Sequence, residues 1–272
     1  MLNFLDPHHS TPDPRIRGKL LRLRKQDPSA TPVLESHKYF KSQIEPLFPP
    51  GMLIEQSLCT VFPALLKKYN KELRRDEKRQ FLRDEGRAGT YLAEEEPHGL
   101  LVTSMIYDDQ HACCDFKPKW LTPSPFTHDG AKRCRNCAMA AKRGDHDGFG
   151  AWCPLALNSD NEEILRKHLD GAFGNLRGAP FYVPEQVSYA IPFLKQSGMM
   201  RRLRELQEEY KVEELLGEGP PGEKLKLAMT LRDCTMFMKD GYPLLLPAFA
   251  ERRSHRCDIP ATEEKLFRPT PG

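Results

Sequence analysis

The segment that most constrains this chain is an apolar stretch running directly into two lysines around a proline, "CCDFKPKWL", residues 113–121. It is predicted to form a strand, and the alternation of side chains along a strand places Asp115, Lys117 and Lys119 on one face. Pro118 removes one backbone donor and stiffens the segment. Two cations held about one pleat repeat apart suit two phosphates on one ring. A solvated strand face is the alternative interpretation of the same residues.

A cysteine pair follows this segment. Cys134 and Cys137 have the spacing of zinc ligands, Cys153 offers a third thiolate, and His128 or His146 a fourth ligand. The alternative is that these are ordinary buried cysteines, since free cysteine packs as a small apolar residue. The pattern therefore allows a metal-bound loop next to the lysine pair.

Composition narrows the classes of protein. The 272 residues carry 41 Lys plus Arg against 38 Asp plus Glu, a net charge of +3, which is too small for a general nucleic-acid coat. Hydrophobic residues make up 39%, enough for a core. The chain begins without a basic and apolar leader, and no run approaches the roughly 18 apolar residues of a membrane span. We therefore expect an intracellular protein with eight reduced cysteines and no membrane partner.

The periodicity of apolar residues predicts several elements. In residues 15–25, Leu21 and Leu23 alternate with Arg22 and Arg24, which is typical of a half-buried strand with a cationic outer face. Residues 99–109 are predicted to form a buried strand. Helices are predicted from 34, after Ser159 in a capping box with Glu162, and over 195–216, and a helix or loop over 64–87. Residues 224–237 are predicted to form a strand with one apolar face: Leu225, Leu227, Met229 and Leu231.

Asp233, at the end of that last predicted strand, is the best candidate for a general base or for holding a nucleophile in line. Its alternative interpretation is a structural carboxylate paired with Arg232. The chain contains no G-x-x-x-x-G-K-[ST] loop, which excludes a P-loop enzyme. It contains no H-R-D or D-F-G set either, which excludes a protein kinase.

Taken together, five blocks of the sequence resemble the inositol-pentakisphosphate 2-kinase family, most of all its fungal members. The blocks follow one another in the family's order between about residues 15 and 239, and any one alone would be weak. They are "DFKPKW" from Asp115, "RCRNCAMAAKR" from Arg133, "WCPLALNSDN" from Trp152, "GNLR" from Gly174 and "RDCT" from Arg232.

The resemblance implies an α+β fold with two lobes. Its expected parts are a disordered start at 1–14, an N-terminal lobe at 15–106, a C-terminal lobe with the inositol phosphate site at 107–239 and an irregular tail at 240–272. The implied activity transfers the γ-phosphate of ATP, with Mg²⁺, to the 2-hydroxyl of inositol pentakisphosphate and yields inositol hexakisphosphate (phytate). A monomer in the nucleus or cytoplasm, with no nucleic-acid partner, is expected.

The resemblance also assigns roles to residues. Asp233 would be the catalytic carboxylate facing the 2-hydroxyl. The nucleotide would contact Arg22, Thr103, Ser104, Met105 and Asp115, with 103–105 as the adenine hinge. Substrate phosphates would be held by Lys117, Lys119, Arg143, Asn175 and, on a looser match, Arg87.

Two departures from the family favour an alternative. No glycine precedes Arg15, where the family has a Gly-rich strand and turn over the ATP phosphates. Nothing after Asp233 matches the family's Asp-Leu-x-x-Lys-Pro block, which supplies a magnesium-binding Asp. We therefore expect a resemblance that ends in mid-domain at both ends, and a chain that is either a kinase or a weak or inactive inositol-polyphosphate-binding relative. A zinc-bound nucleic-acid binder is a third reading, but the charge balance and the absence of an aromatic and basic platform count against it.

Overall fold

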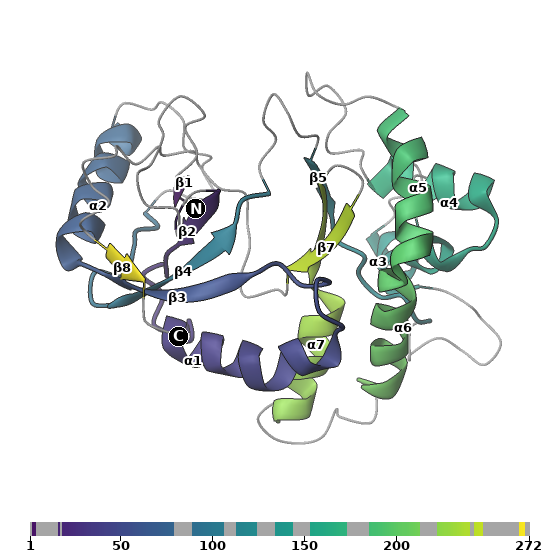
Figure 1. The fold of residues 1–272 in the computed structure, drawn as a ribbon, viewed down its shortest axis with the longest axis horizontal. Coiled ribbons are helices and arrows are strands. Elements are labelled where there is room, and N and C mark those ends of the chain that lie inside the picture. Colours follow the sequence, from purple (N-terminus) through teal and green to yellow (C-terminus); the bar gives the residue numbers. More distant parts are fainter. Residues whose placement is uncertain are drawn as a thin grey trace. The chain divides into compact units, whose positions relative to one another are not determined.

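The computed structural model describes residues 2–3, 16, 18–78, 89–105, 113–123, 134–143, 153–172, 185–212, 222–239, 242–246 and 267–269 (Figure 1). The chain divides into two compact units, each with its own sheet. Unit 1 comprises residues 1–42, 54–104 and 252–272, and unit 2 comprises 43–53 and 105–251. Helices and strands both contribute, which confirms the predicted α+β class.

Unit 1 contains an antiparallel five-stranded sheet in the order β1-β2-β4-β3-β8. The predicted strands at the start of the chain and near residue 100 are confirmed as β2 and β4. The bounds are β1 Leu2–Asn3, β2 Lys19–Arg22, β3 Gln56–Val61, β4 His98–Thr103 and β8 Phe267–Pro269.

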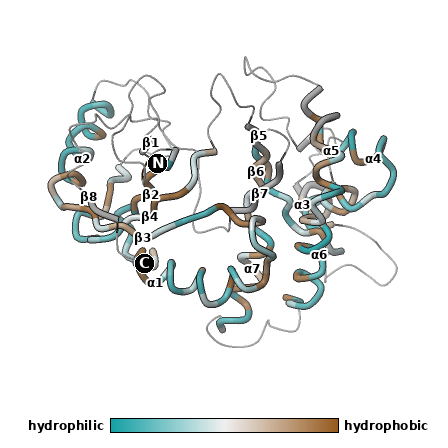
Figure 2. The backbone as a smooth tube through the Cα atoms, viewed as in Figure 1, coloured by the Kyte–Doolittle hydropathy of each residue, from teal (hydrophilic) through white to brown (hydrophobic). Residues whose placement is uncertain are grey.

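The core of unit 1 lies between this sheet and helix α2 (Pro63–Lys78). Leu65, Leu66 and Tyr69 of α2 join Leu21, Leu101 and Cys59 in one buried cluster, although most of α2 is hydrophilic (Figure 2). A Cβ at Gly99 would lie 2.9 Å from both Leu21 Cδ1 and Val61 Cγ2, so a larger residue at this position would crowd these two buried side chains.

The charge-dense run of the sequence forms a helix over 63–78, and its remainder, 79–87, lies outside the described residues.

The predicted helix from residue 34 begins one residue earlier, as α1 (Val33–Tyr39), and continues as a π-helical segment (Phe40–Ile44) and a 3₁₀ turn (Glu45–Leu47). The carboxylate of Glu96, which is buried, accepts a hydrogen bond from the Val33 N–H at 3.0 Å. That bond satisfies one of the donors that a helix start leaves unpaired.

Unit 2 contains a three-stranded antiparallel sheet in the order β5-β6-β7. Its strands are β5 Cys113–Phe116, β6 Thr235–Lys239 and β7 Tyr242–Leu246. Pro243 lies in the edge strand β7, where the missing N–H costs least. The prediction of an irregular tail is therefore wrong for β7 and β8, and that of a disordered start is wrong for β1; the rest of both segments lies outside the described residues.

The helices of unit 2 correct two sequence predictions. Gly198, at φ 65°, separates α5 (Glu185–Ser197) from α6 (Met199–Glu209), so no single helix spans 195–216. Residues 224–232 form helix α7 (Glu223–Arg232) rather than a strand. Leu227, Ala228 and Leu231 are buried at helical spacing, whereas Met229, predicted to share a face with Leu227 and Leu231, is 42% exposed. The apolar alternation that suggests a strand is therefore misleading.

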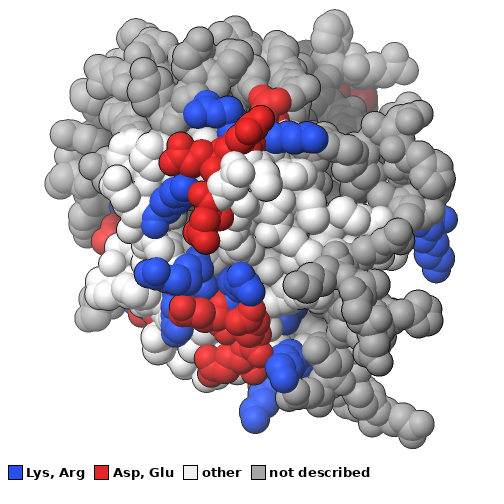
Figure 3. Space-filling model, turned by 90° about the vertical axis from the view of Figure 1, so that its right-hand side faces the viewer, with Lys and Arg blue, Asp and Glu red and all other residues white. Residues whose placement is uncertain are grey.

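Three more helical elements lie in the described part of unit 2: α3 (Arg135–Arg143), a 3₁₀ segment (Pro154–Asn158) and α4 (Glu162–Ala172). The side chain of Asn161 caps α4 by accepting from the Glu163 N–H at 2.9 Å, so the predicted capping role of Ser159 is wrong. On the face shown in Figure 3, Lys and Arg side chains lie beside Asp and Glu side chains. Lys195 Nζ of α5 pairs with Glu162 Oε1 of α4 at 3.3 Å. Within the described part of the chain, no helix has the length and apolarity needed to cross a membrane.

Candidate active site

Strand pairing in unit 2 brings the lysine segment to Asp233. Phe116, the last residue of β5, pairs with Met236 near the start of β6. Lys117 and Lys119 follow β5 directly, and Asp233 lies two residues before β6, at the end of α7. Residues more than a hundred positions apart in the sequence therefore meet at one end of the sheet.

Both ammonium groups contact the same oxygen of Asp233. Lys117 Nζ donates to Asp233 Oδ1 at 2.9 Å and Lys119 Nζ donates to it at 3.0 Å. The side chains remain 29%, 34% and 51% exposed, respectively for Lys117, Lys119 and Asp233. The group carries one surplus positive charge and is open to solvent, which is the condition for binding an anion from solution.

The lysines converge by a different route from the one the sequence predicts. Lys117 lies beyond the end of β5, and Lys119 has a left-handed backbone with φ 58°. The alternation of side chains along a strand therefore does not apply to this pair, and the prediction of one shared strand face is wrong. The proximity of the two lysines is nevertheless real, because a turn and not a pleat brings them together.

The two lysines also set the ionisation of Asp233. Partial burial raises the pKa of Asp233, but hydrogen bonds from Lys117 and Lys119 and their positive charges outweigh it, and the pKa is lowered. Asp233 is therefore ionised at neutral pH. An ionised carboxylate can accept a hydrogen bond from a hydroxyl and orient it for attack.

Arg232 does not serve as the structural partner of Asp233 that the alternative interpretation requires. Its guanidinium is buried, donates to the carbonyls of Ala228 and Gln207, and lies over the Trp120 ring at 5.0 Å. The hydrogen bonds that lower the pKa of Asp233 come from the two lysines.

The residues predicted to contact nucleotide lie on β2, on and just after β4, and, for Asp115, on β5 itself. Arg22 ends β2 and Thr103 ends β4; the Thr103 N–H donates to Glu55 O and the Ser104 N–H to Gly18 O. These two amides are already engaged, so a purine at this edge would need other groups of 103–105. Met105 is buried, and Asp115 is an exposed residue of β5. Their nucleotide-binding roles stay predictions.

Three predicted phosphate ligands are not placed by the structure. Arg87 and Asn175 lie outside the described residues. Arg143 is the last residue of α3, and its side chain is outside the described part of the chain. Their roles therefore stay predictions as well.

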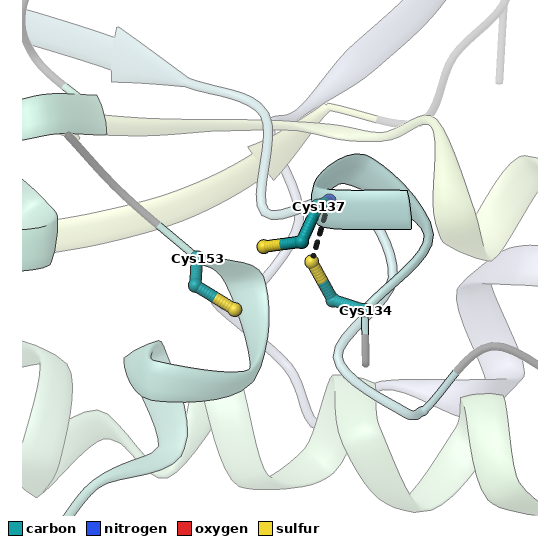
Figure 4. A group of neighbouring side chains, drawn as sticks. All are labelled: Cys134, Cys137 and Cys153. Atoms are coloured by element: carbon teal, nitrogen blue, oxygen red, sulfur yellow. Dashed lines mark hydrogen bonds between the residues drawn. The ribbon is translucent and has the colours of Figure 1, made fainter. Parts of the chain in front are cut away.

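The three predicted cysteine ligands do come together. The Sγ atoms of Cys134, Cys137 and Cys153 all lie within 4.8 Å of one another. Figure 4 shows them converging from the start of α3 and from the 3₁₀ segment, and the Cys137 N–H donates to Cys134 Sγ at 3.1 Å. Sulfurs on one tetrahedral zinc lie about 3.8 Å apart, given a Zn–S bond of about 2.3 Å. A small contraction would therefore bring the three thiolates onto one ion, whereas His128 and His146 lie outside the described residues.

Hydrogen bonds between the cysteines shift the thiol pKa values of Cys134 and Cys153 in opposite directions. Hydrogen bonding from Cys134 lowers the pKa of the Cys153 thiol to about 5, against the opposing effect of burial, and the Leu155 and Ala156 N–H groups add to the lowering. The same hydrogen bond and burial raise the pKa of Cys134. Cys153 therefore ionises before Cys134. This matters for metal binding because a cysteine binds a metal as its thiolate.

Sequence reasoning missed the polar residues that support these groups. His168 of α4 accepts a hydrogen bond from the Cys153 N–H at its Nδ1 atom, at 2.9 Å. Gln207 of α6 binds the backbone on both sides of Trp120. Neither residue stands out in sequence, since a His or Gln in an amphipathic helix usually faces solvent.

Comparison with known proteins adds an independent observation. A family model described as inositol-pentakisphosphate 2-kinase matches residues 4–265. An inositol-pentakisphosphate 2-kinase of the yeast Yarrowia lipolytica is 27% identical over 129 residues, which are 46% of this chain and 39% of that protein. The match thus spans well under half of the relative's length.

The family match extends past both limits, residues 15 and 239, at which the sequence resemblance was expected to end. Those two limits are therefore wrong, and the matched range includes β6, β7 and the segment that carries Asp233. Because the match covers nearly the whole chain, the chain belongs to the inositol-pentakisphosphate 2-kinase family.

Proposed function

We propose that this chain transfers the γ-phosphate of ATP to the 2-hydroxyl of inositol pentakisphosphate and forms inositol hexakisphosphate. The observation that supports it best is the meeting of two ammonium groups and one ionised carboxylate at Asp233 Oδ1. Phosphoryl transfer depends mainly on positioning and on charge neutralisation. This group supplies cations for substrate phosphates and an acceptor for the attacking hydroxyl in one place.

In this proposal the lysines exchange partners when substrate binds. Lys117 and Lys119 turn from Asp233 to phosphates of the inositol ring, and Asp233 Oδ1 is then able to accept a hydrogen bond from the 2-hydroxyl. Arg143, Asn175 and Arg87 are the further proposed phosphate ligands. Arg22, Thr103, Ser104, Met105 and Asp115 are the proposed nucleotide contacts.

The residues fit magnesium in part. Magnesium bound with ATP neutralises charge on the transferred phosphoryl group. Asp233 is a carboxylate of the kind that such an ion prefers, but no Asp-Leu-x-x-Lys-Pro block follows it in the sequence. The two lysines at Asp233 suit anion binding with or without transfer, so a second candidate is an inositol-polyphosphate-binding relative with weak or no transfer.

One reaction separates the candidates. Purified chain is incubated with ATP, Mg²⁺ and the pentakisphosphate whose 2-hydroxyl is free, and products are resolved by anion exchange; a pentakisphosphate blocked at position 2 is the control. Formation of hexakisphosphate from the first compound alone supports the kinase. Tight binding without product supports the second candidate, and absence of both overturns the proposal.

We also propose that Cys134, Cys137 and Cys153 bind zinc. Three thiol sulfurs within 4.8 Å, one of them with a lowered pKa, form a donor set that suits zinc. The ion would join the start of α3 to the 3₁₀ segment. The monomeric state and the nuclear or cytoplasmic location expected from the sequence remain predictions.

A further inference from the structure

Gln207 connects the two segments that carry the candidate active site. It lies on α6 and is 1% exposed. Its Nε2 donates to the carbonyls of Lys119 and Leu231, both at 2.9 Å, and its Oε1 accepts from the Leu121 N–H at 2.8 Å. One side-chain amide therefore satisfies three backbone groups on two segments.

The first of these segments needs such support. Lys119 has a left-handed backbone at φ 58°, a conformation that residues with a Cβ adopt only where their surroundings hold them. Gln207 binds the carbonyl of Lys119 and the N–H of Leu121, two residues further on. Asn158 donates to the Leu121 carbonyl at 3.3 Å. These bonds fix the turn from which the Lys119 side chain leaves.

The second segment is the end of α7. Leu231, whose carbonyl accepts from Gln207, lies two residues before Asp233. Between them, Arg232 donates to the backbone carbonyl of Gln207 and lies over the ring of Trp120, the residue after Lys119. The backbone before Asp233 and the backbone of Lys119 are thus tied to the same residue.

We propose that Gln207 is a positioning residue, which sets the separation of the Lys119 ammonium and the Asp233 carboxylate and so tunes the site for inositol polyphosphates. The inference rests on the proposed function for its ligand, but the geometry at Lys119 can be tested without any ligand. The three hydrogen bonds of the Gln207 side chain described above all go to backbone groups, so Gln207 acts through the residues it holds.

The first test uses Gln207→Met, which keeps the length of the side chain and removes its hydrogen bonds. Calorimetry with inositol pentakisphosphate, at a temperature where the variant is folded, is expected to show an affinity loss of about tenfold or more. In a Lys119→Ala background the same substitution is expected to add less than about twofold, because the group it positions is gone. Leu203→Ala, also buried on α6, is the control and leaves the affinity unchanged.

The second test needs no ligand. Lysines are methylated with a ¹³C label, and the Lys119 signal is assigned by a Lys119→Arg variant. In the parent protein this signal is expected to move as Asp233 titrates, and in Gln207→Met that response is expected to vanish. If Gln207→Met does not fold, Gln207→Glu replaces it, since it keeps the shape and the acceptor for Leu121 but loses the two donors.

The outcomes separate the two ideas. A parent chain that does not bind inositol pentakisphosphate removes the proposed function, while the lysine signals still decide the role of Gln207. An unchanged Lys119 response in the variant overturns that role. So does an affinity loss of equal size in the parent and in the Lys119→Ala background.

Discussion

Two lysine–carboxylate contacts in this protein differ in one respect. In unit 1, Lys19 Nζ contacts Glu55 Oε2 at 2.8 Å and Thr103 Oγ1 at 3.2 Å, so one cation meets one anion. In unit 2, two cations meet Asp233. The first contact is charge-balanced and ties neighbouring strands. The second places two cations against one anion at a solvent-exposed position, which is an arrangement that suits the proposed binding of an anion.

The strongest test of this contrast is the removal of each carboxylate charge. Asp233→Asn is expected to lower phosphate transfer by about 10²–10⁴-fold, the range for a positioned acid–base group, with ATP binding nearly unchanged. Glu55→Gln is expected to leave both unchanged, because its ion pair is 84% exposed on the Glu55 side and such pairs contribute little. Rates of labelled phosphate transfer measure both variants. Undiminished transfer by Asp233→Asn would remove Asp233 from its role.

The next test asks whether the cluster of Cys134, Cys137 and Cys153 supports the lysine–Asp233 contact of unit 2, whereas a cysteine of unit 1 does not. Cys137→Ser is expected to abolish stoichiometric zinc binding and to weaken protection of the Lys117–Leu121 backbone, because Arg135, next to Cys134, lies over the Trp120 ring at 4.9 Å. Metal analysis and amide exchange measure these effects. Cys59→Ala, in the core of unit 1, is expected to keep its zinc. A purified parent chain without zinc, whose stability is indifferent to chelators, would contradict the site.

Individual lysines give a smaller effect. Lys117→Ala and Lys119→Ala are each expected to weaken inositol polyphosphate binding about tenfold or more, since a hydrogen bond to a charged group contributes about 1.5–3 kcal/mol. Lys19→Ala is the matched control and is expected to leave this affinity unchanged. Calorimetry measures the affinity of each variant for inositol pentakisphosphate. Equal affinity in the parent and in both unit 2 variants would mean that the surplus charge has another purpose.

The smallest expected effect is a pH dependence. The pKa of Asp233 is lowered from 3.8, and that of Glu55 is lowered from 4.5 by the hydrogen bond and charge of Lys19. A carboxyl group with a lowered pKa stabilises the fold above its unfolded-state pKa and loses this contribution as pH falls through the folded value. Carboxyl ¹³C titration below pH 4.5 is expected to show Lys117→Ala raising only the pKa of Asp233 and Lys19→Ala only that of Glu55. A cross effect would show that the two contacts are not independent.

The sequence predicts individual strands better than it predicts the packing and contacts between elements. The alternation around Leu21 and the apolar run at Leu100–Val102 identify two strands of unit 1, because both patterns follow from burial on a sheet. Leu225, Leu227, Met229 and Leu231 alternate as well, yet they lie on α7, where tertiary packing of Leu227, Ala228 and Leu231 decides the outcome.

The candidate site shows the same limit. Lys117, Lys119, Asp233 and the three cysteines are identified by residue type and spacing, and the structure brings each set together. The left-handed turn at Lys119 has no signature in the sequence, since lysine seldom adopts it. Nothing in the sequence connects Gln207 to residues 119–121 either, because that contact depends on how α6 packs in the folded unit.

The buried ring of Trp120 gives the site an optical reporter. Two tryptophans occur in the sequence, so a Trp152→Phe variant leaves Trp120 as the single indole emitter. The Arg135 and Arg232 guanidiniums lie over its ring at 4.9 and 5.0 Å, and a charge at that distance shifts the emission of an indole. Loss of the proposed zinc beside Arg135 and the proposed binding of phosphates at Lys119 are both expected to change this emission. Stopped-flow fluorescence can therefore time the two events in one unlabelled chain.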